Sequence, residues 1–103
     1  MNTIHYTISA SENTPSFGKP EPKEPRFAIS VANEWTEFET PTSKKIKAYL
    51  KSHQNPFKCL YKLSLDDDTD EIEIKLYDQN EQYKNLGEAL ANVIEVLNKV
   101  EYN

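Results

Sequence analysis

Several residue types are scarce in this chain of 103 residues, and each scarcity excludes a class of protein. Its two glycines are too few for the glycine-rich loops that hold phosphate groups. Its single cysteine excludes a framework of internal disulfides and is typical of a reducing compartment. No apolar stretch is long enough to span a membrane, and the first residues lack the pattern of a signal peptide. We therefore expect a cytoplasmic protein with no membrane partner.

Residues able to hold a metal or to attack a substrate are few as well. His5, His53 and Cys59 do not make up the four ligands of a zinc site. Cys59 lies on the apolar side of an alternating segment, which predicts a small core residue and not a nucleophile. The carboxylates gather on a predicted turn, whereas acid–base catalysis needs a buried carboxyl. We therefore expect no enzyme, no cofactor and no metal site.

Alternation of apolar and polar residues predicts four strands. A period of two is typical of a half-buried strand. It runs through Thr3–Ser9, Arg26–Ala32, Phe57–Leu65 and Glu71–Tyr77. The segment Glu34–Thr40 is ambiguous, because it is either a short strand or a bend that brings Trp35 and Phe38 into the core.

Residues 10–25 are predicted to form an exposed, proline-rich loop. Four of the six prolines fall within it: Pro15, Pro20, Pro22 and Pro25. Proline has no backbone N–H group and fixes φ, so this segment is not expected to join a strand or a helix. A loop of this length is either a solvated connector or a segment that docks on a partner.

Two amphipathic helices are predicted. The first begins at Thr40-Pro41, a capping residue followed by proline at the first helical position, and it runs to Asn55 before Pro56 stops it. Its apolar stripe consists of Ile46, Tyr49, Leu50 and His53. The second helix starts from Tyr83, and its apolar arc is wide enough for more than one neighbour.

The wide arc of the second helix has two interpretations. It packs on the sheet and on the first helix, or its central row is the seam of a homodimer, because the steps match heptad spacing. That row consists of Leu86, Leu90, Val93 and Leu97. Gly87 within this helix predicts a close approach of another backbone.

The order of these elements predicts the fold class. It runs β-β-(β)-α-β-β-α, and a chain of 103 residues is expected to be a single domain. Neighbouring strands joined by a tight turn pair antiparallel, and the helices have apolar faces to bury. We expect an α+β domain over residues 1–103, with an antiparallel sheet of four or five strands and two helices on one face.

Charge is sorted along the chain. Residues 1–65 carry nine Lys and Arg and six Asp and Glu (+3), residues 66–103 carry three and eleven (−8), and the net charge is −5. Five acids gather at the predicted hairpin tip: Asp66, Asp67, Asp68, Asp70 and Glu71. They do not complete a calcium loop, because Glu71 stands where that loop needs glycine and Tyr77 where it needs glutamate.

Charge also predicts the register of this hairpin. With Asp67-Asp68 as a two-residue turn, Lys62 faces Glu73. A shift by two residues would place Lys62 opposite Lys75, which is a repulsive pair. We expect the first register, with a slightly longer loop as the alternative, because Asp-Asp is a weaker turn pair than Asp-Gly.

Lysines form a stripe on the first helix, opposite its apolar face. The stripe consists of Lys44, Lys47 and Lys51. Such a row has three interpretations. It is exposed only to solvent, it pairs with an acidic surface of this chain or of a partner, or it contacts the phosphates of a nucleic acid. The net acidity of the chain argues against nucleic acid.

Three classes of function remain. We favour a small, acidic, non-catalytic module that binds another protein through the hairpin tip, the proline-rich loop or both. A phage or mobile-element inhibitor that blocks a host protein is its most concrete form. The alternatives are a nucleic-acid-binding domain that uses the lysine stripe and a structural homodimer built on the last helix.

Overall fold

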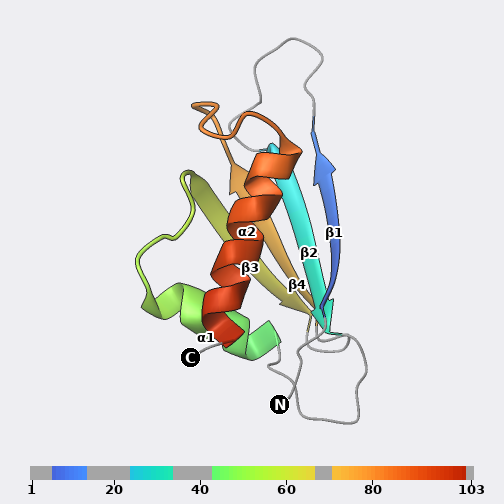
Figure 1. Cartoon of the computed structure of the whole chain (residues 1–103), viewed down its shortest axis with the longest axis vertical. Coiled ribbons are helices and arrows are strands. Elements are labelled where there is room, and N and C mark those ends of the chain that lie inside the picture. The colour runs from blue at the N-terminus through green and yellow to red at the C-terminus, as the bar shows by residue number, and fades with distance from the viewer. Residues whose placement is uncertain (1–5, 14–23, 34–42, 67–70, 102–103) are drawn as a thin grey trace.

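The computed structural model describes residues 6–13, 24–33, 43–66 and 71–101, which form a four-stranded antiparallel sheet with two helices on one face (Figure 1). The elements in chain order are β1 (Tyr6–Glu12), β2 (Phe27–Asn33), α1 (Ser43–Ser52), β3 (Leu60–Asp66), β4 (Glu71–Tyr77) and α2 (Leu86–Glu101). The strand order across the sheet is β1-β2-β4-β3, so β1 and β3 are its edges. The predicted α+β class and element order are confirmed, while the ambiguous segment Glu34–Thr40 lies outside the described residues.

The core lies between the two central strands and both helices. Alternation places every second residue of β2 and β4 on the helix side, where each is at most 1% exposed. These residues are Phe27, Ile29, Val31, Ile72, Ile74 and Leu76. They meet Ile46 and Leu50 of α1, together with Ala89, Val93 and Val100 of α2. No described element packs on the opposite face of the sheet, which carries mostly small and charged side chains, together with Leu60 and Tyr77.

The first helix is shorter than predicted. It ends at Ser52, three residues before the predicted end at Asn55, because local contacts replace its next turn. The Ser52 hydroxyl donates to the Tyr49 carbonyl at 3.1 Å, and the His53 ring stacks on the Tyr49 ring at 3.9 Å between centroids. The capping pair Thr40-Pro41 lies outside the described residues.

The second helix begins at Leu86 and not at Tyr83. Asn85 caps it, since its Oδ1 atom accepts the Glu88 N–H group at 2.9 Å. A Cβ atom added at Gly87 would lie 3.2 Å from this same Oδ1 atom. The close neighbour of Gly87 is therefore the capping side chain, and no backbone in the described ranges makes the predicted close approach.

The first strand extends further than predicted. The ladder between β1 and β2 continues to the pair Glu12 and Phe27. Beyond it, the Asn13 N–H group donates to the Arg26 carbonyl at 2.8 Å. Residues 10–12 therefore belong to a strand and not to the proline-rich loop, most of which lies outside the described residues.

The hairpin of β3 and β4 has the register that its charges disfavour. Lys62 lies opposite Lys75, so the predicted pairing of Lys62 with Glu73 is wrong. Because the last pair of the ladder is Asp66 with Glu71, four residues separate the two strands instead of the predicted two. Cross-strand charge pairs contribute only about 0.2–1 kcal/mol, which is too little to impose a poor turn.

Packing supports the observed register. Each inward residue of β4 lies between an inward residue of β2 and one of β3, as Ile74 lies between Ile29 and Leu63. The two lysines are accommodated separately on the other face of the sheet. The Lys75 ammonium lies 3.2 Å from a Glu73 carboxylate oxygen, and the Lys62 ammonium lies over the Tyr77 ring at 5.8 Å.

Candidate functional site

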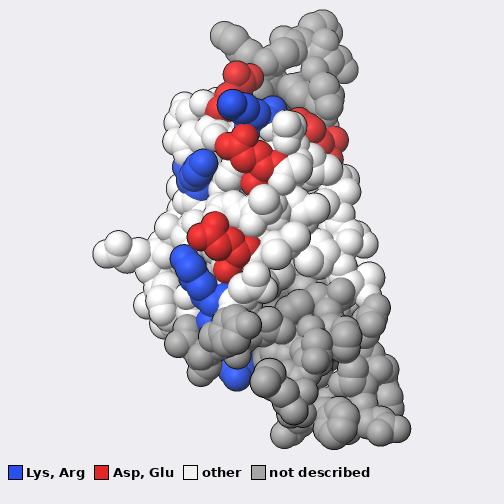
Figure 2. Space-filling model, in the orientation of Figure 1, with Lys and Arg blue, Asp and Glu red and all other residues white. Residues whose placement is uncertain are grey.

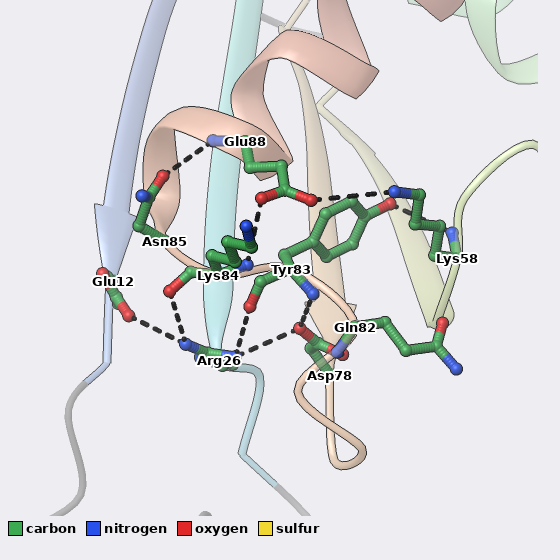
Figure 3. A network of polar contacts seen from close by, with 9 residues as sticks. All are labelled: Glu12, Arg26, Lys58, Asp78, Gln82, Tyr83, Lys84, Asn85 and Glu88. Atoms are coloured by element: carbon green, nitrogen blue, oxygen red, sulfur yellow. Dashed lines mark hydrogen bonds and ion pairs between the residues drawn. The ribbon is translucent and has the colours of Figure 1, made fainter.

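Asp78 is the only charged side chain that is fully buried among the described residues (Figure 3). It directly follows β4 and continues the inward alternation of that strand, so its carboxylate points to the helix side. Oδ1 accepts the Gln82 N–H group at 2.8 Å, and Oδ2 accepts the Tyr83 N–H group at 2.8 Å. The turn after β4 therefore closes around this carboxylate.

Arg26 neutralises Asp78 and joins three elements. Its Nη1 atom lies 3.1 Å from Asp78 Oδ2 and donates to the Tyr83 carbonyl at 2.9 Å. Its Nη2 atom lies 3.6 Å from Glu12, while the guanidinium covers the Phe27 ring at 4.8 Å. These contacts fasten the end of β1 and the start of β2 to the turn after β4. Because its donors are used within the chain, we assign Arg26 a structural role.

Tyr83 extends this network to α2 and to the segment before β3. Its ring packs edge-to-face on Phe27, with centroids 6.1 Å apart. Its hydroxyl accepts the Lys58 N–H group at 3.0 Å and donates to Asn92 Oδ1 at 2.5 Å. Burial raises the pKa of the Tyr83 hydroxyl, so the phenol stays neutral and keeps both hydrogen bonds.

Cys59, the one cysteine of the chain, is held in an unreactive form. Burial, followed by the negative charge of Asp78, raises the pKa of the Cys59 thiol to about 11. The thiol is therefore protonated at neutral pH and is a poor nucleophile. In the described ranges, no group of three His, Cys, Asp or Glu side chains could hold a metal ion.

A shallow pocket of about 280 Å³ opens at the end of the sheet where β3 begins and β4 ends. It is lined mostly by amide and other polar side chains: Asn55, Lys58, Cys59, Leu60, Tyr77, Asp78, Gln79, Asn80 and Gln82. Leu60, the first residue of β3, is 72% exposed and is the most exposed large apolar side chain described. Asp78, which is held by the network described above, lines one side of this pocket, and the exposed Leu60 lines another.

The edge strand β3 is the least covered strand for which every side chain is described. Exposed and half-buried residues alternate along it, and none of its seven residues is fully buried. The neighbouring β4, in contrast, has a fully buried residue at every second position. The half-buried residues of β3 on the helix side are Tyr61, Leu63 and Leu65. The outer side of β3 thus combines a backbone that pairs with no other described strand and partly exposed apolar side chains.

The acidic hairpin tip lies at the far end of β3. Asp66 is exposed and Glu71 is half-buried where the ladder ends. Asp67, Asp68 and Asp70 lie outside the described residues. On the helix face of the molecule, positive and negative side chains alternate in small groups, so the charge sorting along the sequence does not divide this face into two halves (Figure 2).

The lysine stripe is only partly described. Lys51 is exposed and Lys47 is half-buried, while the side chain of Lys44 lies outside the description. Neither Lys47 nor Lys51 makes an ion pair with another described residue. A nucleic-acid contact through this stripe stays a prediction.

The four residues of the predicted dimer row on α2 differ in burial. Val93 and Leu97 are 0% and 2% exposed and belong to the core of their own chain. Leu86 and Leu90 are half-buried and pack against the same core. This supports the first interpretation of the wide arc, in which α2 packs on the sheet and on α1. Of the four residues, only Leu86 and Leu90 are left partly exposed for a seam, and a homodimer through this helix stays a prediction.

No sequence pattern identified the pair of Arg26 and Asp78. Both residues lie next to the ends of strands, where charged residues ordinarily mark solvent-exposed turns. One feature of the sequence could have indicated that Asp78 is buried. It follows Leu76 by two positions, so it falls on the same, inward side of the strand pattern. No helix in the described part of the chain is long and apolar enough to cross a membrane. No family model, curated protein or solved structure matches this chain.

Proposed function

We propose that this chain is a non-catalytic protein-binding module that adds an extended strand of a partner protein to its edge strand β3. The carrying observation is the outer side of β3: the seven residues Leu60–Asp66 pair with β4 and with no other described strand. Strand addition is a common form of peptide recognition, in which backbone groups provide affinity and alternate side chains provide specificity.

Most features that protect an edge strand are absent from the described part of β3. Natural edges are short, bulged, covered, charged or interrupted by proline. The ladder of β3 with β4 runs through seven consecutive pairs without a bulge, and the strand contains no proline. Its one lysine, Lys62, occupies the uncovered face of the sheet. A regular edge of this length, with a single lysine, is suited to the addition of a partner strand.

Side chains beside the edge add to this surface. A strand placed next to β3 would cover the half-buried Leu63 and Leu65 on the helix side. Leu60 and the adjoining pocket would receive a side chain at one end of the added strand. The acidic tip at the other end, with Asp66 and Glu71, would attract a basic partner. An inhibitor that blocks a host protein is one form of this proposal.

Selection from a library of random heptapeptides tests the proposal. The immobilised chain is expected to enrich peptides that alternate apolar and polar residues and that bind with about micromolar Kd. Binding should be lost when proline blocks the outer side of β3. Failure to enrich any peptide on the wild-type chain above the blocked variant would contradict the proposal.

The variant with a blocked edge is chosen from two proline substitutions in β3. Successive N–H groups of a strand point to opposite sides, so only one of Ser64→Pro and Leu65→Pro removes an outward donor. The variant that keeps the wild-type circular dichroism spectrum is used. Ser9→Pro and Ala10→Pro make the matched pair on the other edge, β1, and their folded member is expected to bind the selected peptides like the wild type.

A further inference from the structure

The ladder between β3 and β4 contains two like-charge pairs on the uncovered face of the sheet. Lys62 lies opposite Lys75, and Asp66 lies opposite Glu71. Like charges directly across a ladder destabilise it. Among the described residues Lys62 makes no ion pair, and its ammonium lies over the Tyr77 ring. Both pairs involve a residue of β3, whose outer side faces no other described strand.

We propose that the strand added to β3 is β3 of a second copy of this chain, paired antiparallel about a two-fold axis at Ser64. This inference rests on the proposed function, because it names the partner strand. Four positions separate Lys62 from Asp66, with Ser64 midway between them. An antiparallel pair centred on Ser64 therefore places Lys62 of each copy opposite Asp66 of the other.

Strand geometry leaves few other registers. Residues on the same face must lie opposite each other, so the axis passes through a residue of β3. An axis at Lys62 would place the two lysines opposite each other, and an axis at Leu63 would place Lys62 opposite Ser64. Within the seven residues of β3, the axis at Ser64 alone pairs Lys62 with an acid.

Pairing in this register offsets the repulsion inside each chain. Each row across the joined sheets would contain Lys75 and Lys62 of one copy beside Asp66 and Glu71 of the other. Two positive side chains would then face two negative ones, in both rows of the dimer. The like-charge pairs of each chain would become the complementary halves of an interface.

The helix side of β3 supports the same axis. Leu63 and Leu65 are half-buried there at the edge of the core. An axis at Ser64 places Leu63 of each copy opposite Leu65 of the other, so both leucines would lose contact with water. Charged pairs on one face and apolar pairs on the other thus favour one register.

Analytical ultracentrifugation of the full chain and its charge-swapped variants tests this register. Lys62→Glu alone and Asp66→Lys alone place like charges opposite each other twice per dimer, so each should weaken dimerisation at least about 10-fold. The double variant Lys62→Glu/Asp66→Lys restores opposite charges and should return to within about threefold of the wild type. Lys99→Glu on α2 is the control and should leave dimerisation unchanged.

Weakening by each single swap together with recovery in the double variant supports the proposal. A wild-type chain that stays monomeric up to about 1 mM overturns it. A dimer that neither swap weakens also overturns it and places the interface on another surface, such as the half-buried Leu86 and Leu90 of α2. Circular dichroism of each variant confirms that a weakened dimer is not an unfolded chain.

Failure of this inference is distinguishable from failure of the proposed function. A monomer that still binds selected peptides along β3 overturns the second copy as the partner and leaves strand addition standing. A monomer whose peptide binding is the same with and without the proline block overturns both.

Discussion

The carboxylate of Asp78 lies 3.1 Å from the guanidinium of Arg26, and this pair joins the end of β4 to the start of β2. The Asp78 side chain has no exposed surface, and that of Arg26 is 16% exposed. A buried ion pair adds little net stability by itself, but removal of one partner leaves an uncompensated buried charge. The pair is therefore the most sensitive point in the end of the sheet that carries the pocket.

Asp78→Asn is expected to lower the free energy of unfolding by about 3 kcal/mol, because it removes the buried charge that pairs with Arg26 and leaves only the more distant, partly exposed Glu12. Urea denaturation followed by circular dichroism measures this loss. Glu12→Gln is the matched control, since Glu12 contacts the same guanidinium at 3.6 Å from a 31% exposed position. Its expected cost is less than about 1 kcal/mol. Equal costs for the two variants would contradict the structural role assigned to Asp78.

Tyr83→Phe is expected to destabilise the chain by about 2 kcal/mol, because the Lys58 N–H group and Asn92 Oδ1 would both lose their partner. The ring packing on Phe27 stays intact in this variant. Tyr49→Phe is the control, since the Tyr49 ring stacks on His53 without needing its hydroxyl. A Tyr83→Phe variant as stable as this control would show that the hydroxyl contacts are unimportant.

The Cys59 thiol should react slowly in the folded chain. Its pKa is raised from 9.0 to about 11, so the thiolate fraction at pH 8 is about 100-fold lower than in an unfolded chain. Alkylation by iodoacetamide at pH 8 should be slower by at least about that factor in the native chain than in urea. Equal rates would contradict the burial of this thiol.

The same raised pKa couples stability to pH. Because the folded chain holds the Cys59 proton more tightly, stability should fall as pH rises from about 9 to about 11. Cys59→Ala removes this titration, so its stability should change less than that of the wild type over the same range. A wild-type pH profile parallel to that of the variant would contradict the prediction.

The repulsion between Lys62 and Lys75 can be measured by a double-mutant cycle. Lys62→Thr, Lys75→Thr and the double variant should give an unfavourable coupling of about 0.5 kcal/mol at low salt, provided that the chain is monomeric. The coupling should approach zero in about 1 M salt. A cycle between Glu73 and Lys75, whose charges lie 3.2 Å apart, should give a coupling of the opposite sign.

Apolar periodicity predicts the architecture of this chain, because burial depends on the side of a strand or helix on which a residue falls. Ile72, Ile74 and Leu76 alternate and are all fully buried, as the pattern requires. The register of the β3–β4 hairpin was not predicted correctly, because one surface charge pair contributes less than turn geometry and core packing. Residues with local patterns were predictable, whereas those paired across the fold were not.

The candidate surface depends on the order of strands in the sheet, and adjacency in sequence does not determine that order. A sequence with four alternating segments does not show that β3 is an edge, nor that Asp66 and Lys62 each face a like charge. The acidic tip was visible as a cluster in the sequence. The structure adds that Asp66 is the last residue of an edge strand, so the acidic tip lies at one end of the candidate binding surface.

Hydrogen exchange of the individual β3 amides, measured by NMR with and without a strand partner, tests the central claim most directly. The partner is either a selected peptide at saturation or the chain itself at high concentration. Binding along the edge predicts that alternate amides between Leu60 and Asp66, those facing outward, gain protection while the amides of β1 do not. Unchanged exchange of all outward β3 amides under conditions where the partner is bound would contradict the account.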